Sequence, residues 1–264
     1  EELLDRLGIS DGWFCEFGAW DGKHYSNTYN LIDNGTDWHG VLIEADTERY
    51  EALQKMTANH SNRLYSINRS ITATGENALD NVLTDTPIPK EFDLLSIDVD
   101  GPDYFIWKEF TSYTPAIVII EYNPSLGPEL RMISELTPDT WLTINQQMVN
   151  SIDALPVERR GERIRLMGSS FSSIVNLGYE KGYVPVSCTQ NNVILVVEEY
   201  IDQLGLSAQE LDDPTVLYED EFLPSEFYED SPADNIRKVR ASVENNGFTE
   251  TTRLILSKLK RGLR

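Results

Sequence analysis

The stretch FCEFGAWDGKHYSNTYNL, residues 14–31, decides the fold. It opens with apolar residues that suit a buried strand and changes at Gly18 and Gly22 to small and polar residues. In open α/β sheets, ligands bind beyond the carboxyl ends of the strands, and glycine lets the first strand-to-helix turn approach a ligand closely. We therefore predict that this turn is the ligand-binding edge of an α/β protein.

Short apolar runs alternate with helix-compatible segments along the first half of the chain. The runs are apolar throughout, which is typical of parallel strands that are covered by helices on both faces. Strands are predicted at residues 13–17, 40–43, 64–67, 92–97 and 116–121, and helices at 26–34, 47–56, 75–83 and 104–110.

The second half of the chain has a different order of predicted strands and helices. A predicted helix over 169–181 stops at Gly182, and two close strands over 183–187 and 193–197 indicate an antiparallel edge on the otherwise parallel sheet. The fold class expected is therefore α/β, a Rossmann-like sheet with helices on both faces. The expected domains are residues 1–200, with 124–168 as a substrate-side insertion, and an acidic and then basic C-terminal extension over 201–264.

Composition narrows the possible partners and the compartment. The chain has 44 acidic and 22 basic residues, a net charge of -22, which repels nucleic acid and anionic membranes and is compatible with a salt-rich host. Cys15 and Cys188 are the only cysteines, so a disulfide framework is not indicated and a reducing cytoplasm is expected. No apolar run approaches the about 18 residues that suggest a membrane span.

Two acidic residues make the first turn a poor site for phosphate. Glu16 and Asp21 lie where a dinucleotide would place its pyrophosphate, and the pattern G-x-G-x-x-G is absent. Glu44 ends the next predicted strand, 22 residues after Gly22, near the offset at which an acid receives ribose hydroxyls. S-adenosylmethionine carries a ribose, an ammonium and a sulfonium but no phosphate, so it suits these charges better.

Four segments in register resemble the FkbM-type methyltransferases. The resemblance implies a seven-stranded class I methyltransferase fold and transfer of a methyl group, usually to oxygen. Trp20 departs from the pattern at a position expected to be small or polar, and Glu44-Ala45-Asp46 lacks a proline that often follows the acid. The four segments are EFGAWDG (16–22) with SNT (26–28), GVLIE (40–44), DLLSIDVDG (93–101) and IIEYN (119–123).

The turn, the strand ends and the resemblance together give a predicted cofactor site. The alternatives are that Glu16 only caps a helix, that Gly22 only forms a turn and that Ser70 lies in an ordinary loop. The predicted cofactor-binding residues are Glu16, Gly18, Ala19, Asp21, Gly22, Asn27, Glu44, Ala45, Ser70 and Asp98.

Asp98, Glu121 and Asn123 follow or end adjacent predicted strands, so we expect them at one edge of the sheet. Their hard oxygen ligands suit Mg²⁺ or Ca²⁺, which makes a metal site one hypothesis. The alternative is that Asp98 orients the methionine end of the cofactor while Glu121 and Asn123 contact substrate.

A hydroxyl acceptor must lose a proton, so a general base is needed. His24 lies just past the cofactor turn and titrates in a suitable range, although a solvated loop histidine is equally compatible. Asp100, Asp103 and Glu121 are the other candidates for the base. Arg159 and Arg163, beside Arg160 and Arg165, are candidates for gripping an anionic saccharide, with simple surface exposure as the alternative.

The sequence therefore predicts a cytoplasmic S-adenosylmethionine-dependent methyltransferase. Its acceptor is expected to be a saccharide or another small hydroxylated metabolite, with O-methylation as the reaction. The basic tail is a candidate for a contact between subunits. Two alternatives remain open: a Rossmann-type oxidoreductase that uses NAD(P), and a non-catalytic module that binds S-adenosylmethionine.

Overall fold

The structure of the chain is a computed structural model. It divides into two units, Glu1–Glu219 and Asp220–Arg264, and every described residue lies in the first. The division expected at residue 200 and the insertion over 124–168 stay predictions. The structure describes residues 2–33, 37–99, 101–124, 128, 133, 168–207 and 211–218.

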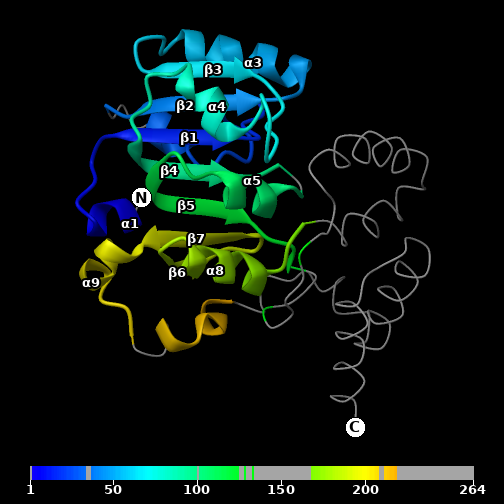
Figure 1. Cartoon of the computed structure of the whole chain (residues 1–264). Coiled ribbons are helices and arrows are strands. Elements are labelled where there is room, and N and C mark those ends of the chain that lie inside the picture. Colours follow the sequence, from blue (N-terminus) through cyan, green and yellow to red (C-terminus); the bar gives the residue numbers. More distant parts are fainter. Residues whose placement is uncertain are drawn as a thin grey trace, which may run out of the picture. The chain divides into compact units, whose positions relative to one another are not determined.

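Seven strands form one sheet in the order β3-β2-β1-β4-β5-β7-β6 (Figure 1). Strands β1 to β5 run parallel, whereas β7 runs antiparallel to both β5 and β6. This arrangement confirms the predicted fold class and matches the Rossmann-like class I methyltransferase fold. The strands are β1 (Trp13–Phe17), β2 (His39–Glu44), β3 (Leu64–Asn68), β4 (Glu91–Ile97), β5 (Thr114–Glu121), β6 (Tyr183–Cys188) and β7 (Asn192–Val197).

Helices cover both faces of the sheet, as expected for strands that are apolar throughout. One core cluster joins α4, α5 and α8 to one face, and a second joins α1, α2, α3 and α9 to the other. The described helices are α1 (Glu2–Arg6), α2 (Tyr29–Asp33), α3 (Thr47–Ala58), α4 (Leu79–Thr84), α5 (Asp103–Glu109), α8 (Phe171–Glu180) and α9 (Ile201–Leu204), with short 3₁₀ turns η3 (Glu198–Tyr200) and η4 (Pro214–Leu217).

The side chains of strand β1 alternate between the two core clusters. Phe14 belongs to the cluster under α2 and α3, whereas Cys15 and Phe17 belong to the cluster under α4 and α5. Successive side chains of a strand point to opposite faces, so an apolar residue is needed at nearly every position. Glu16 is the exception, and its burial needs a separate explanation.

Two of the predicted helices begin three or four residues later than expected. Helix α4 starts at Leu79 rather than at residue 75, because Gly75 adopts a left-handed φ of +85° and Thr72 forms a bridge with Ala78. Helix α2 starts at Tyr29 rather than at residue 26, because the preceding residues bind the Glu16 carboxylate instead of forming a helical turn.

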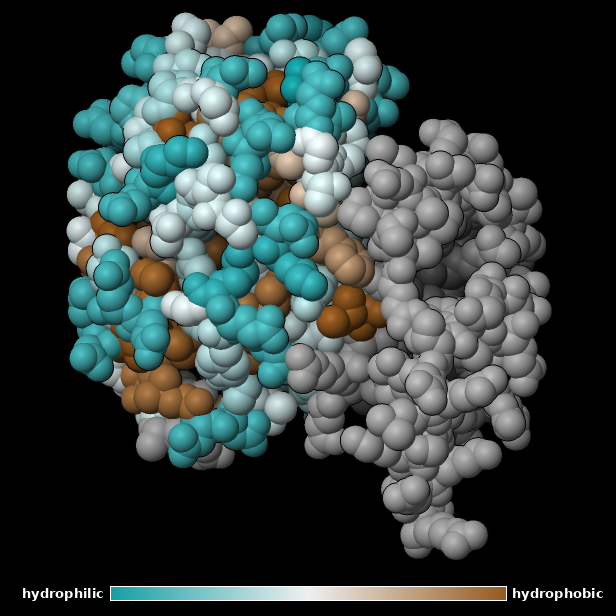
Figure 2. Space-filling view, viewed as in Figure 1, coloured by the Kyte–Doolittle hydropathy of each residue, from teal (hydrophilic) through white to brown (hydrophobic). Residues whose placement is uncertain are grey.

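The described surface carries no continuous apolar face in the view of Figure 2, where hydrophilic residues separate the apolar patches. Both cysteines are free, and Cys15 is buried. Among the described helices, none has the length and apolar character needed to cross a membrane. The cytoplasmic location stays a prediction.

Candidate functional site

Strand pairing aligns residues of neighbouring strands in rows across one face of the sheet. Glu16 of β1 pairs with Leu42 of β2 and with Ser96 of β4. Ser96 pairs with Ile119 of β5, which pairs with Ile194 of β7. In each parallel strand the residue two positions later lies on the same face and nearer the carboxyl edge. In the antiparallel strand β7 it is the residue two positions earlier. These residues form what we call the carboxyl-edge row: Glu44, Gly18, Asp98, Glu121 and Asn192.

Backbone hydrogen bonds between neighbouring strands continue past the strand ends to residues of this row. The Gly18 N–H donates to the Ile43 carbonyl at 3.1 Å, and the Asp98 N–H donates to the Phe17 carbonyl at 3.3 Å. Glu121 pairs directly with Asn192. From Glu44 to Glu121 the row crosses three strand spacings, about 14 Å, which is room for a nucleoside with an amino-acid arm.

The Glu44 carboxylate is 5% exposed and already holds two backbone groups. Its Oε2 accepts the Trp20 N–H and its Oε1 accepts the Asp46 N–H, each at 2.8 Å. A carboxylate has about four lone-pair sites, so two remain for the hydroxyls of a ribose. The residues present therefore fit the nucleoside part of S-adenosylmethionine.

The sequence showed Trp20 only as a departure from the family pattern and gave no sign of its role in this turn. Its backbone has a left-handed φ of +49°, and Tyr25 nearby has a φ of +57°. The Arg49 guanidinium lies 4.0 Å from the Trp20 ring centroid, and the Tyr25 ring lies 5.9 Å from it. The cation–π contact and the Glu44 hydrogen bond hold Trp20 in a conformation that costs on the order of 1–3 kcal/mol.

Gly18 and Gly22 are favoured by different features of the turn. A Cβ at Gly18 (φ +80°) would collide with the carbonyl oxygen of Asp98, so glycine lets the ends of β1 and β4 meet. A Cβ at Gly22 (φ +77°) would meet only the flexible side-chain ends of Met56 and Leu53 on α3, so the positive φ is the stronger reason for glycine at that position. Their approach to a bound cofactor stays a prediction.

Glu16 turns into the protein and anchors the segment after the glycine turn. It is 3% exposed, and its carboxylate accepts hydrogen bonds from Ser26 Oγ (2.7 Å), Asn27 N–H (2.8 Å) and Thr28 Oγ1 (2.7 Å). Burial raises the pKa of this carboxyl, and the three hydrogen bonds oppose the rise only in part. Any contribution of Glu16 to a cofactor site would therefore act through residues 26–28.

Glu16→Gln is expected to leave the fold intact and to stabilise it at neutral pH. The amide oxygen can accept from Asn27 N–H, and the amide nitrogen can donate to the two hydroxyls. A raised native pKa means that wild-type stability is greatest below the unfolded value of 4.5 and falls as pH rises through the native pKa. Melting curves should therefore show the advantage of the variant growing from pH 4.5 to 8.

Glu16→Leu is the matched control, because it removes the acceptor of all three donors. It should lose about 2–4 kcal/mol of unfolding free energy at pH 4.5, since the three donors are left without their acceptor, and the loss should shrink as pH rises because the stability of the wild type itself falls. A glutamine variant as unstable as the leucine variant would contradict this description of Glu16.

Asp21 and His24 form a pair at the exposed side of the turn. The Asp21 Oδ1 accepts the N–H groups of Lys23 and His24, and its Oδ2 lies 2.6 Å from His24 Nδ1. Partial burial alone would raise the pKa of the Asp21 carboxyl, but the N–H and imidazole of His24 and the N–H of Lys23 outweigh it and hold the pKa below its usual value. The His24 side chain is 68% exposed, and its role as a base stays a prediction.

The turn after β4 is held by Asp103, which the sequence suggested only as a possible base. Its carboxylate is buried and accepts the N–H groups of Val99 (2.9 Å) and Gly101 (2.7 Å). These bonds fix the backbone that follows Asp98. The structure therefore gives Asp103 a positioning role.

The remaining predicted cofactor residues lie in the segments that follow β1, β2 and β3. Asn27 Nδ2 donates to Ser96 Oγ at 3.0 Å, beside the row. Asn68 Nδ2 donates to the carbonyls of Glu44 and Ala45, which joins β3 to β2 two residues before Ser70. Ala19 is buried, and its N–H donates to the Ile43 carbonyl. Direct contacts of Asn27, Ala45 and Ser70 with a cofactor stay predictions.

Glu121 and Asn123 lie at the end of β5, as expected. The Asn123 N–H donates to the Ser169 carbonyl at 2.8 Å, which ties this strand end to the start of α8. The described residues contain no group of three or more His, Cys, Asp or Glu side chains placed to hold a metal ion. The metal hypothesis therefore gains no support from them. Asp100, Arg159 and Arg163 lie outside the described residues.

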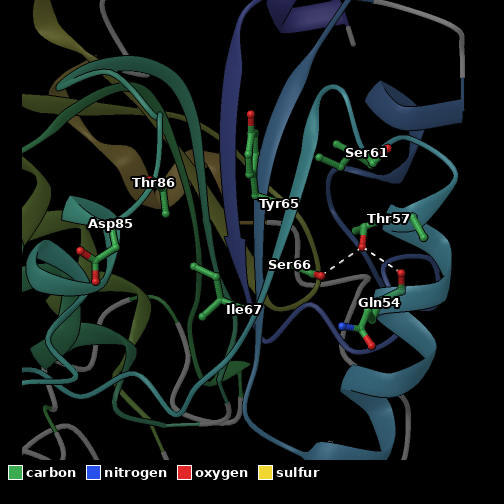
Figure 3. Close-up of a pocket in the computed structure, with 10 residues that line it drawn as sticks. Gln54, Thr57, Ser61, Tyr65, Ser66, Ile67, Asp85 and Thr86 are labelled. Carbon is green, nitrogen blue, oxygen red and sulfur yellow. Dashed lines mark hydrogen bonds between the residues drawn. The ribbon is translucent and has the colours of Figure 1, made fainter.

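The described structure has two hollows whose walls contain no residue of the carboxyl-edge row. A small apolar one, about 110 Å³, lies between α1, α2 and the middle of β4, β5 and β7 beside Asn27. A larger one, about 370 Å³, follows edge strand β3 (Figure 3). In Figure 3, Ser66 faces Thr57 of α3 while Tyr65 and Ile67 point to the other side. It is an open surface groove along the strand.

Comparisons with known proteins identify no family for this chain. No family model matches the chain, and no curated protein matches it. A solved S-adenosylhomocysteine-bound methyltransferase from Podospora anserina is 11% identical, with 70% of this chain and 71% of that chain covered and a TM-score of 0.42. A proposed O-methyltransferase from Klebsiella pneumoniae is 16% identical, with 74% and 76% covered and a TM-score of 0.40.

A proposed caffeoyl-CoA O-methyltransferase from Staphylococcus aureus is 14% identical, with 74% of this chain and 79% of that chain covered and a TM-score of 0.41. None of these likenesses identifies the FkbM subtype, the cofactor or the acceptor of this chain. Those assignments are proposals that depend on the chain's own sequence and site.

Proposed function

We propose that this chain is an S-adenosylmethionine-dependent methyltransferase that methylates a hydroxyl oxygen of a saccharide or another small metabolite. The observation that carries the proposal is the carboxyl-edge row, in which a ribose-compatible acid at the end of β2 shares one face with Asp98 and Glu121. Glu44 would hold the ribose, Gly18 would border the cofactor, and Asp98 would receive its amino-acid end. The FkbM subtype rests on the four sequence segments.

The turn after β1 disfavours a dinucleotide. Helix α2 has five residues and begins at Tyr29, seven positions after Gly22, so no helix N-terminus lies at the glycine turn to bind a pyrophosphate. Asp21 adds a carboxylate at that turn. An adenosyl compound that carries positive charge and no phosphate fits this turn better than NAD(P) does.

The residues of the row supply alignment and proton removal. When bound, the cofactor supplies an electrophilic methyl group, whose carbon gains a bond to oxygen as it loses its bond to sulfur, leaving S-adenosylhomocysteine and one proton. Glu121 lies beside Asp98 on the same face and is our first candidate to take that proton. Most of the acceleration would come from alignment of the acceptor with the methyl group.

Isothermal titration of the purified chain tests the proposal. S-adenosylmethionine and S-adenosylhomocysteine should each bind at one site, whereas NADH should not. Binding of NADH alone would support the oxidoreductase alternative. Cofactor binding without methyl incorporation into any hydroxylated acceptor would support a non-catalytic module.

Glu121→Gln is expected to lower kcat about 100-fold or more, because an amide cannot take the proton from the hydroxyl that receives the methyl group. The Kd for S-adenosylhomocysteine should stay unchanged, which separates proton removal from cofactor binding. His24→Ala is the comparison, measured as kcat in the same assay. A larger loss in that variant than in Glu121→Gln would move the base to His24.

A further inference from the structure

Two buried oxygens stand out among the hydrogen-bonding groups of the described residues. Ser169 Oγ and Asn192 Oδ1 are buried side-chain atoms without a hydrogen-bond partner. The residues are 3% and 7% exposed, so solvent does not replace the missing partners. A buried polar group that is left unpaired costs on the order of 1–3 kcal/mol and calls for a physical explanation.

Both atoms belong to residues at the same strand end. Asn192 is the Cα partner of Glu121 across the β5–β7 ladder, and directly opposed residues of an antiparallel pair project to the same face. Asn192 is thus the last member of the carboxyl-edge row, next to our candidate base.

Ser169 is joined to the same strand end from the other side. Its carbonyl accepts the Asn123 N–H at 2.8 Å, two residues beyond Glu121. A Cβ added at the preceding residue, Gly168, would lie 3.9 Å from the Cα of Gly101 and 4.0 Å from the Cβ of Asn123. The residues after β4, after β5 and before α8 therefore converge where Ser169 lies.

We propose that Ser169 and Asn192 form a polar subsite for the methyl acceptor, and that this subsite takes a neutral hydroxyl-rich molecule such as a saccharide. The inference rests on the proposed function, because it assigns the acceptor side of that site. An amide oxygen needs a donor, and a serine hydroxyl can donate or accept. Sugar hydroxyls do both.

Charge decides between a neutral and an anionic acceptor. Glu121 lies directly beside Asn192, and the whole chain carries a net charge of -22. A carboxylate or phosphate group of the acceptor would be repelled at this place. The subsite therefore favours neutral sugar hydroxyls over the anionic saccharide expected from the arginine cluster.

Stability of the ligand-free protein gives the first test. Ser169→Ala and Asn192→Leu remove polar atoms that have no partner, so each should raise the melting temperature by about 2–4 °C. Ser96→Ala is the matched control, because Ser96 is equally buried but accepts from Asn27 Nδ2, and it should lower the melting temperature. A loss of stability in the first two variants that equals the loss in Ser96→Ala would overturn the inference.

Binding of a neutral sugar gives the second test. Methyl α-D-glucopyranoside should produce a saturation-transfer signal with the wild-type chain at millimolar concentration, and each of the two variants should weaken that binding at least about 10-fold. The variants should keep the wild-type Kd for S-adenosylhomocysteine. Unchanged sugar binding in both variants, or no sugar binding by the wild type, would reject the subsite.

The two hypotheses fail in different ways. Absence of S-adenosylhomocysteine binding by the wild-type chain counts against the proposed function, whatever the sugar does. Normal S-adenosylhomocysteine binding without any effect of Ser169→Ala and Asn192→Leu on sugar binding counts against the subsite alone.

Discussion

Glu44→Gln is expected to weaken S-adenosylmethionine binding about 100-fold, or roughly 2.7 kcal/mol. The carboxylate accepts the N–H groups of Trp20 and Asp46, and two lone-pair sites remain for ribose hydroxyls. The amide of glutamine replaces one oxygen by a donor that can bind neither N–H group. Titration calorimetry measures the loss of affinity, and melting curves measure the accompanying loss of stability.

Asp93→Leu separates the two effects of that substitution. Asp93 lies at the amino end of β4, where its Oδ2 accepts the Trp13 N–H at 2.8 Å. The leucine variant should lose about 1–3 kcal/mol of unfolding free energy, comparable to the loss in Glu44→Gln, because the Trp13 N–H loses its acceptor. Its affinity for S-adenosylmethionine should not change. Equal weakening in both variants would show that Glu44 acts only through stability.

Gly18→Ala is expected to lower the unfolding free energy by more than about 3 kcal/mol and to abolish cofactor binding. Its Cβ would collide with the Asp98 carbonyl oxygen, so the ends of β1 and β4 would have to separate. The positive φ of +80° adds strain for any residue with a side chain. Denaturant unfolding and cofactor titration of the same preparation measure the two losses.

Gly75→Ala is the control that separates the steric collision of an added Cβ from the strain of a positive φ. Gly75 has a similar φ of +85°, but nothing lies within 4 Å of an added Cβ. That variant should lose only about 1 kcal/mol. A Gly18→Ala variant no less stable than Gly75→Ala would mean that the ends of β1 and β4 do not need this close contact.

The strands could be predicted because their sequence pattern is uninterrupted. Strand β1 has the predicted bounds, and β4 begins one residue earlier than predicted. Helix starts were less predictable where side chains compete for the backbone. Ser26 and Asn27 bind Glu16 rather than opening a helix, and no local pattern shows that Glu16 turns inward.

Residues that the site brings together from distant segments were the hardest to find. Asn192 reads as part of a turn in the sequence, and only its pairing with Glu121 places it in the carboxyl-edge row. Ser169 reads as the start of a helix, whereas α8 begins at Phe171 with Ser170 as its N-cap. The proposed subsite depends on missing hydrogen bonds, which a sequence does not display.

A crystal structure of the chain with S-adenosylhomocysteine tests the central claim most directly. We predict density along the carboxyl-edge row, with both ribose hydroxyls on the Glu44 carboxylate and the amino-acid end past Gly18 toward Asp98. Density for the nucleoside anywhere else, or a diphosphate held at the Gly18–Gly22 turn when a dinucleotide is supplied, would contradict it.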